Sequence, residues 1–203
     1  MSTQRISLSL YCLFVGSAFA AGPFGFERGM TKEQVVKLVG QGAVKDSDVY
    51  GDDVLEVATA PDPHPDFEDY LLVISPKQGL LKIIASGKKV RTTRYGDDLH
   101  DLFLETTAAL VNIYGPVTNT FDFLASDSTW DEPQDWMMGL VKGERRLISF
   151  WVFKTTPRPK HICGITLEAH ALSMEKGFLT LRYEFEGSLE YDAAKKAKTG
   201  RVL

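Results

Sequence analysis

Residues 97–115, DDLHDLFLETTAALVNIYG, decide the fold, because they carry the one long helical pattern of the chain. Small or apolar side chains recur there at steps of three and four, which places them along one side of a helix: Leu99, Leu102, Phe103, Thr106, Ala109, Leu110 and Ile113. We expect the carboxylate of Asp97 or Asp98 to cap the first turn. Gly115 and Pro116 are expected to end the helix, since glycine accepts a left-handed cap and proline cannot continue the ladder.

Most of the chain on either side of this helix shows strand patterns. A hairpin is expected over residues 70–86, with Pro76 and Gly79 in its turn. Further strands are expected at 54–60, 118–124, 136–141, 145–153, 161–172 and 178–186, of which 136–141 and 145–153 would pair across Lys142-Gly143-Glu144. We therefore predict an α+β fold, in which one long and one short helix pack on an antiparallel sheet.

The last predicted hairpin has the clearest alternation of apolar and polar residues. One of its faces is expected in the core and consists of Ile165, Leu167, Ala169, Leu179, Leu181, Tyr183 and Phe185. If the turn is centred near Glu175, Glu168 comes opposite Arg182, a contact that contributes only about 0.2–1 kcal/mol.

The short helix is predicted within residues 25–40, GFERGMTKEQVVKLVG. Thr31 and Gln34 match a capping box, in which each side chain accepts a hydrogen bond from the backbone N–H of the other residue. Gly40 is expected to stop this helix after about eight residues, which is too short to be stable without tertiary packing.

The same segment resembles the opening helix of small bacterial envelope proteins related to SmpA/OmlA, a lipoprotein of the outer-membrane barrel assembly machine. It also resembles the repeat of β-lactamase-inhibitor-protein-like folds. In both families a helix that begins G-M-T or G-x-T precedes a small antiparallel sheet. Residues 75–88, SPKQGLLKIIASGK, and 135–147, DWMMGLVKGERRL, are similar to an uncharacterised family of exported proteobacterial proteins. The resemblance implies a fold and a compartment but no activity.

Residues 1–20 have the pattern of a cleaved signal peptide. Arg5 precedes an apolar run, and Ala18-Phe19-Ala20 fits the small-x-small motif before a signal-peptidase site. The apolar run is too short for a membrane-spanning helix, which needs about 20 residues. We therefore expect export to the periplasm and no membrane span.

The mature chain is expected to form one domain. Residues 21–191 would make up this α+β domain, with two candidate halves, 24–94 and 95–191, that share one continuous sheet. The remaining residues, 192–203, form a tail rich in lysine and alanine that frays or forms a short helix.

Composition narrows the classes of partner. The 203 residues are 44% hydrophobic and 25% charged, as in ordinary globular proteins. Without Arg5 the mature chain has 22 basic and 27 acidic side chains, a net charge of −5, which disfavours nucleic acid as a partner. Cys163 is the only cysteine left after the signal, so no internal disulfide can form and the thiol is either buried or available for an intermolecular bond.

No catalytic motif is present: the chain has no G-x-S-x-G, H-E-x-x-H, C-x-x-C, Walker or Rossmann pattern, and no cofactor is implied. His161 and Cys163 are two residues apart on a predicted strand, where they would share a face and form a thiolate–imidazole pair. A buried, inert thiol is the favoured interpretation. Asp62, His64 and Asp66 are weak candidates for metal ligands on a proline-rich loop, and no metal is assigned because the spacing of a calcium loop is missing.

Three tryptophans and two arginines are the candidate binding residues: Trp130, Trp136, Trp151, Arg145 and Arg146. Exposed tryptophan beside arginine is typical of protein interfaces. The alternative is a sheet that is buried on both faces, where large aromatic side chains serve the core.

These features favour a non-enzymatic periplasmic protein that binds another protein or an envelope component. A second hypothesis is a glycan-binding or hydrolytic envelope protein that uses the acids around Trp130, namely Asp122, Asp127, Asp131, Glu132 and Asp135. A third, an inhibitor or immunity-type protein, depends on fold analogy alone.

Overall fold

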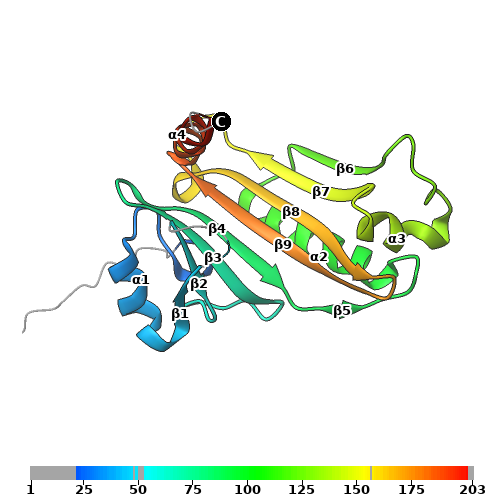
Figure 1. Ribbon diagram of the computed structural model, residues 1–203, viewed down its shortest axis with the longest axis horizontal. Helices are drawn as coiled ribbons and strands as arrows, with labels where there is room; N and C mark the ends of the chain where they lie inside the picture. Colours follow the sequence, from blue (N-terminus) through cyan, green and yellow to red (C-terminus); the bar gives the residue numbers. More distant parts are fainter. Residues whose placement is uncertain (1–21, 48, 50–52, 156, 201–203) are drawn as a thin grey trace, which may run out of the picture.

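The structure is a computed structural model that describes residues 22–47, 49, 53–155 and 157–200. Within these ranges the chain forms a nine-stranded antiparallel sheet with α-helices packed on it, which confirms the expected α+β fold (Figure 1). The helices are α1 (Lys32–Val39), α2 (Asp97–Tyr114), α3 (Trp136–Val141) and α4 (Ser188–Gly200). The strands are β1 (Val44–Asp46), β2 (Val54–Val57), β3 (Phe67–Ser75), β4 (Gly79–Gly87), β5 (Val90–Arg91), β6 (Asn119–Leu124), β7 (Arg145–Val152), β8 (Ile162–Ser173) and β9 (Lys176–Phe185).

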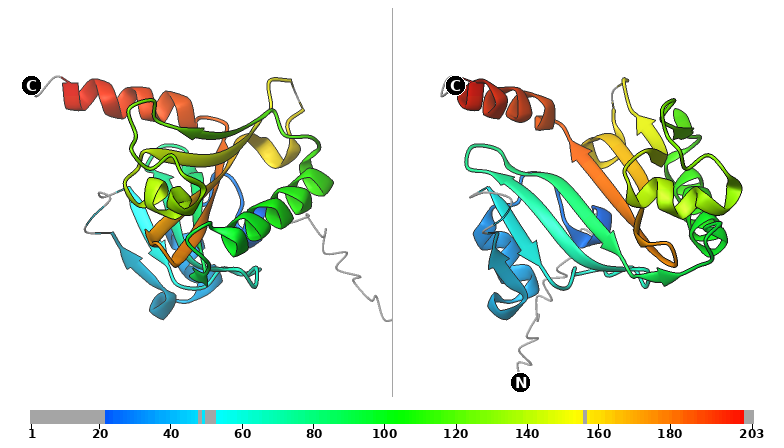
Figure 2. Two further views of the ribbon diagram at one scale, coloured as in Figure 1. Left: turned by 90° about the vertical axis from the view of Figure 1, so that its right-hand side faces the viewer. Right: turned by 45° about the vertical axis from the view of Figure 1, so that its right-hand side comes forward.

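The strand order is β1-β2-β3-β4-β9-β8-β7-β6, and β5 pairs with one end of β9. Strands β1 to β4, which precede α2, thus form one end of the sheet, β6 to β9 form the other, and β4 pairs with β9 where the two ends meet. Figure 2 shows the resulting arrangement, with α2 and α3 together at the β6–β9 end and α1 at the opposite end. The expected signal peptide, residues 1–20, lies outside the described residues.

Helix α1 begins and ends as predicted. Thr31 Oγ1 accepts a hydrogen bond from the Gln34 N–H, and the Gln34 side chain accepts one from the Thr31 N–H, which completes the capping box. Gly40 follows the last turn with φ of 89°. Val35 is fully buried, so the helix is held by the core as well as by its cap.

Helix α2 also ends as predicted, at Gly115, but it begins differently. Gly96 is its N-cap residue, in a left-handed conformation, and neither Asp97 nor Asp98 caps the helix. Instead the Asp98 N–H donates to Thr92 Oγ1 at 3.1 Å. A side chain at position 96 would clash with the ring of Trp136, because a Cβ there would lie 2.3 Å from it. Close packing of α3 therefore explains why the N-cap residue is a glycine, which has no side chain to cap the helix.

The predicted stripe of α2 is correct in its centre and wrong at its far end. Leu99, Phe103 and Leu110 are at most 4% exposed, whereas Ile113 is 68% exposed and Ala109 is also exposed. Only the side of α2 that carries the three buried residues lies on the sheet. The predicted stripe was therefore too wide.

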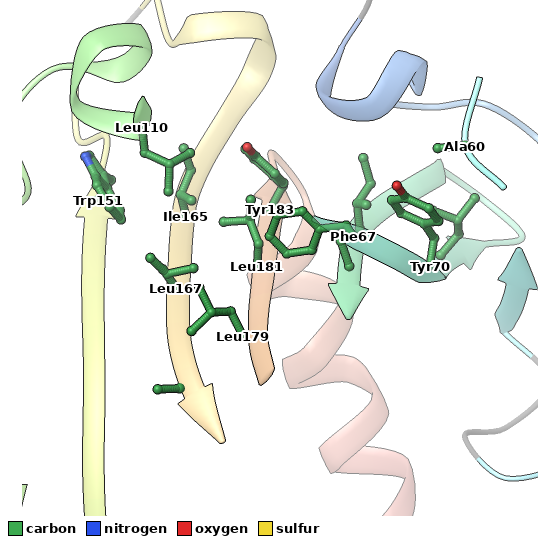
Figure 3. Packing of buried hydrophobic residues seen from close by; sticks show 14 of the residues in the cluster. Ala60, Phe67, Tyr70, Leu110, Trp151, Ile165, Leu167, Leu179, Leu181 and Tyr183 are labelled. Carbon is green, nitrogen blue, oxygen red and sulfur yellow. The ribbon is translucent and has the colours of Figure 1, made fainter. Parts of the chain in front are cut away.

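The core lies on one face of the sheet, which is covered by α2 and α3 at one end and by α1 and the segment before it at the other. All seven residues predicted to face inward from the last hairpin are buried, and Figure 3 shows several of them with Leu110 and Trp151. Trp151 is 1% exposed, and its Nε1–H donates to the Gly115 carbonyl at 3.0 Å, which connects β7 to the end of α2. This face of the sheet is called the core face below.

The prediction of a strand at residues 136–141 is wrong. These residues form α3, whose buried side packs against β7 and β8, and β7 pairs with β6 and β8 instead. A short apolar run has no periodicity that separates a strand from a buried helix. Packing on the sheet selects the helix here.

The predicted register of the last hairpin is also wrong. A bulge between Ala171 and Ser173 shifts the two strands, so that Glu168 lies opposite Thr180. Arg182 lies opposite Thr166. The tail forms α4, which begins at Ser188, four residues before the tail was expected to start.

Candidate binding surface

The face of the sheet opposite α2 is called the open face. It is made by the residues that alternate with the core residues along each strand. On β6 to β9 these are Phe121, Phe123, Arg146, Ile148, Phe150, Val152, Gly164, Thr166, Glu168, His170, Leu172, Phe178, Thr180, Arg182 and Glu184. The mixture of aromatic, aliphatic and charged side chains differs from the mostly apolar core face.

Two phenylalanines on β6 are the most exposed aromatic side chains of the open face. Phe121 is 45% exposed and Phe123 is 50% exposed. Phe121 meets Phe150 of β7 edge to face, with 6.1 Å between the ring centroids. The two rings thus present apolar surface to solvent beside a partly buried aromatic neighbour.

Strand β6 is also the last strand of the sheet at this end. Ala125 donates to the Glu144 carbonyl and continues the ladder toward β7 by one residue. Because the direction of backbone groups alternates along an antiparallel strand, the N–H and C=O groups of Thr120, Asp122 and Leu124 point away from β7. Among the described residues no strand pairs with this outer side, and Asn119 through Phe123 are all exposed.

Ion pairs bridge neighbouring strands of the open face. Arg146 donates through Nε and Nη2 to Glu168 Oε1, at 3.0 and 2.7 Å. Lys82 of β4 lies 3.4 Å from Glu184 of β9. Glu168 therefore pairs across β7 and β8, not with Arg182 as the sequence suggested.

His170 lies on the same face, stacked on Phe178 with 5.1 Å between the centroids. Burial lowers the pKa of His170, and the positive charges of Arg146 and Arg182 lower it further, although the charge of Glu168 acts in the opposite direction. The imidazole is therefore neutral at neutral pH and contributes an aromatic surface rather than a charge.

Helix α4 covers part of the open face at the β2–β4 end. The Tyr191 hydroxyl donates to Asp53 Oδ2 at 2.6 Å, and Lys82 lies 2.5 Å from Asp192. Burial and the hydrogen bond to Asp53 raise the pKa of Tyr191, so the hydroxyl remains a donor. The cavity between the helix and the sheet is lined in part by Val54, Val73 and Ile84 of the sheet and by Tyr191 and Asp192 of α4.

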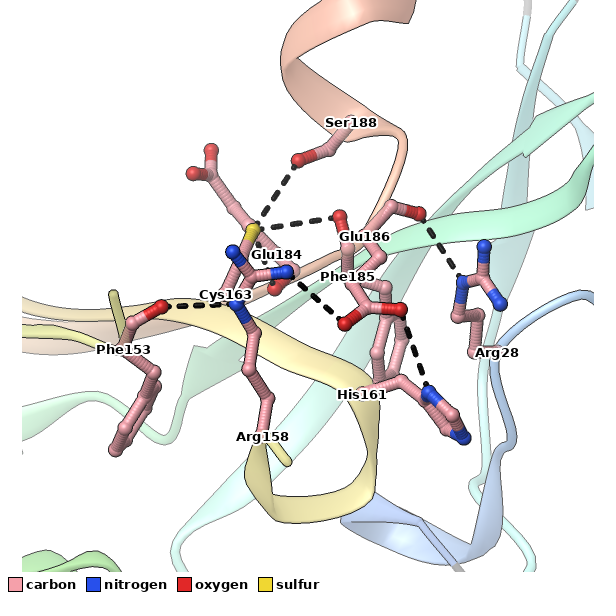
Figure 4. Close-up of polar contacts among 9 residues, drawn as sticks. All are labelled: Arg28, Phe153, Arg158, His161, Cys163, Glu184, Phe185, Glu186 and Ser188. Carbon is pink, nitrogen blue, oxygen red and sulfur yellow. Dashed lines mark hydrogen bonds and ion pairs between the residues drawn. The ribbon is translucent and has the colours of Figure 1, made fainter. Parts of the chain in front are cut away.

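A polar cluster connects the end of the last hairpin to the N-terminal segment (Figure 4). Glu186 accepts from Arg158 at 2.9 Å and lies 3.4 Å from the His161 ring, while Arg28 donates to the Glu186 carbonyl. The hydrogen bond from Arg158 holds the pKa of the Glu186 carboxyl below its usual value. This cluster fixes the point at which α4 leaves the sheet.

The cluster also bears on the less favoured alternative for His161 and Cys163, a thiolate–imidazole pair. His161 precedes β8 with φ of 62° and faces Glu186, whereas the Cys163 thiol donates to the Glu184 carbonyl at 3.2 Å. The two side chains have different partners because the chain turns between them. This alternative is therefore not supported, because His161 contacts Glu186 and Cys163 contacts Glu184.

The five candidate binding residues do not gather at one place. Trp136 and Trp151 are buried at 6% and 1% exposure, and Trp130 is half-buried in the loop after β6. Arg145 donates to Asp122 at 3.0 Å on the core side of β6 and β7. Arg146 lies on the open face, next to the exposed aromatic side chains of β6.

The acids near Trp130 are also spread over different environments. Asp122 is paired with Arg145, and Asp135 lies 3.3 Å from Arg94. Asp127, Asp131 and Glu132 are exposed in the loop. Glycan hydrolysis uses two carboxyl groups that flank one bond, and two of the five carboxylates here are each engaged by an arginine.

The weak metal candidates lie on an exposed loop before β3. The Asp66 N–H donates to His64 Nδ1 at 3.3 Å, and Asp62, His64 and Asp66 are all exposed. Across the described ranges no group of three or more His, Cys, Asp or Glu residues has an arrangement that could hold a metal ion.

Sequence reasoning missed Phe121 and Phe123 as exposed residues, and it did not single out Arg182 as a candidate binding residue. Residues 118–124, TNTFDFL, alternate polar and apolar side chains, and this signal already places both phenylalanines on one face. It could not reveal that this face lacks a covering helix.

Comparison of the chain with protein-family models, with curated proteins and with solved structures finds no match. None of the helices in the described ranges is both long and apolar enough to cross a membrane. The geometry of the open face and of β6 is therefore the basis for a functional proposal.

Proposed function

We propose that this protein is a non-enzymatic binding protein of the periplasm and that it binds an extended segment of another protein along β6. One observation carries the proposal: β6 is a six-residue edge strand with Asn119 through Phe123 exposed and two phenylalanines on one face. Extended segments add to such edges through backbone hydrogen bonds, and alternate side chains give specificity. The partner would therefore be an extended segment with apolar side chains at alternate positions.

The expected signal peptide and the resemblance to envelope proteins support the periplasmic location. Strand addition also explains why two phenylalanines remain in solvent on an edge strand, where they would otherwise favour aggregation. The segment would take its hydrogen bonds from Thr120, Asp122 and Leu124, and its apolar side chains on the open face would contact Phe121 and Phe123.

The test selects random twelve-residue peptides that bind the immobilised mature chain and measures their affinity for single variants. Thr120→Pro removes an outward N–H, which an edge strand tolerates. Thr120→Val is the matched control, because it keeps the N–H and loses only the hydroxyl contact to Ser149. We expect alternating apolar peptides to bind the wild type and Thr120→Val equally, and to bind Thr120→Pro about tenfold more weakly or worse.

Two results would overturn the proposal. One is a set of selected peptides that bind Thr120→Pro as tightly as the wild type, or whose amide shifts map away from β6. The other is a wild-type dimer that pairs through β6 at low concentration, since a second copy would then be the occupant of this edge.

A further inference from the structure

A trough runs along β8 on the open face, apart from the β6 edge. Gly164 and Thr166 form its floor, because the first has no side chain and the second has a small one. Val152, Gly164 and Glu184 are direct neighbours across three strands, and so are Phe150, Thr166 and Arg182. The trough has a volume of about 760 Å³, which is within the range of small-molecule sites.

The two walls of the trough differ in chemistry. The β7 wall is apolar at half-buried Phe150 and at Val152, which is 49% exposed, and Arg146 of the same strand also lines the trough. Leu189 of α4, at 67% exposure, lines the same trough. These side chains expose apolar surface to a concave space, where a ligand chain could cover it.

The β9 wall carries a cation without a counter-charge. Within the described part of the chain no carboxylate lies within ion-pair distance of the Arg182 guanidinium. The nearest carboxylates along and across the strands already have partners, because Glu184 pairs with Lys82 and Glu168 with Arg146. Three more cationic side chains line the trough, namely Arg146, Lys154 and Arg158. Glu184 is the one carboxylate among its lining residues.

We infer that this trough binds a single-chain anionic amphiphile, with its carboxylate or phosphate head at Arg182 and its apolar chain against Phe150, Val152 and Leu189. A planar guanidinium forms strong, paired hydrogen bonds with such head groups. Thr166 lies opposite Arg182 on the neighbouring strand, and its hydroxyl would supply a further donor. This inference does not depend on strand addition at β6.

The experiment is a calorimetric titration of the mature chain with dodecanoate and with dodecyl phosphate, each below the concentration at which micelles form. We expect both to saturate one site. Dodecyltrimethylammonium, which has the same chain and a positive head, is expected not to bind. Acetate is expected to bind at least about 100-fold more weakly than dodecanoate, because it lacks the buried methylene groups.

Variants assign the binding to the trough. Arg182→Gln is expected to lower the affinity for dodecanoate about 10- to 100-fold, because the head group loses a charged hydrogen-bond partner. Arg91→Gln, an exposed arginine on β5, is the matched control and is expected to bind normally. Gly164→Leu fills the floor, since a Cβ there meets ordinary contact distances of 3.6 and 3.7 Å, and it is expected to abolish binding.

Thr166→Phe fills the trough from the next position of the same face and replaces Gly164→Leu if that variant does not fold. Unchanged dodecanoate affinity in Arg182→Gln would overturn the inference, as would equal binding of the cationic amphiphile. Binding to phosphatidylglycerol vesicles without binding of monomeric dodecanoate would also overturn it. Thr120→Pro is expected to bind dodecanoate normally, so failure here is distinguishable from failure at β6.

Discussion

The two end strands of the sheet have opposite characters. β1 has only three residues, its Lys45 and Asp46 are exposed, and Lys32 of α1 forms an ion pair with Asp46. β6 has six residues and presents Phe121 and Phe123 to solvent. Proteins commonly protect sheet edges by short length and charge. The contrast shows that one edge of this sheet is protected and that the other is left open to a partner.

The open face shows the same difference. At the β2–β4 end, α4 lies over the sheet through Tyr191 and Asp192. At the β6–β8 end the open face retains Phe121, Phe123, Val152 and Leu172 at about half exposure. The exposed edge and the uncovered part of the face are thus adjacent.

The largest expected effect separates buried from exposed aromatic residues. Trp151→Ala is expected to lower the free energy of unfolding by about 3–5 kcal/mol, because it leaves a cavity and removes the bond to Gly115. Phe123→Ala is expected to lower it by less than about 1 kcal/mol, as at other surface sites. Urea unfolding at neutral pH measures both. A comparable loss in the two variants would mean that Phe123 serves stability, and the comparison of the edges would fail.

A smaller effect is expected when the charged side chains of β1, the protected edge, are replaced. The double variant Lys45→Val with Asp46→Val is expected to self-associate as its concentration rises, because β1 then presents an apolar edge without charge. Lys45→Gln with Asp46→Asn is the matched control, which removes the charges but keeps polar side chains, and is expected to associate less. Sedimentation velocity gives the association state. If the valine variant remains monomeric, the charged and polar side chains of β1 are not what protects this edge.

The smallest effect concerns the helix that covers one end of the open face. Tyr191→Phe removes the hydrogen bond to Asp53 and is expected to speed amide exchange in α4 by about 2- to 10-fold. Exchange in β8 and β9 is expected to stay the same. Tyr95→Phe, at a side chain that is 50% exposed, is the control. If the rate of amide exchange in α4 stays the same, the Tyr191–Asp53 contact does not hold the helix on the sheet.

Local signals made several features predictable. The capping box of α1 involves residues three positions apart, and the alternation of β8 and β9 involves successive residues, so neighbours in sequence decide both. The bulge at Ala171 to Ser173 was not predictable, because it changes pairing without changing the alternation on either side of it. For the same reason the partner of Glu168 was misassigned.

The candidate site was less predictable than the fold. The three tryptophans were the most conspicuous side chains in the sequence, yet Trp136 and Trp151 serve the core. The alternation of residues 118–124 marked Phe121 and Phe123 as sharing a face. It did not show that β6 would be an edge, because edge position depends on strand order and not on the strand itself.

The sequence by itself determined the helix α1 with its cap, the extent of α2, most strands and the inward face of the last hairpin, since each depends on residues within a few positions of one another. Only the tertiary structure decided that residues 136–141 are helical, that β6 ends the sheet and that no carboxylate of the described residues lies within ion-pair distance of Arg182. Those outcomes depend on which distant segments come to lie side by side, and the free energy of that packing is a property of the assembled sheet.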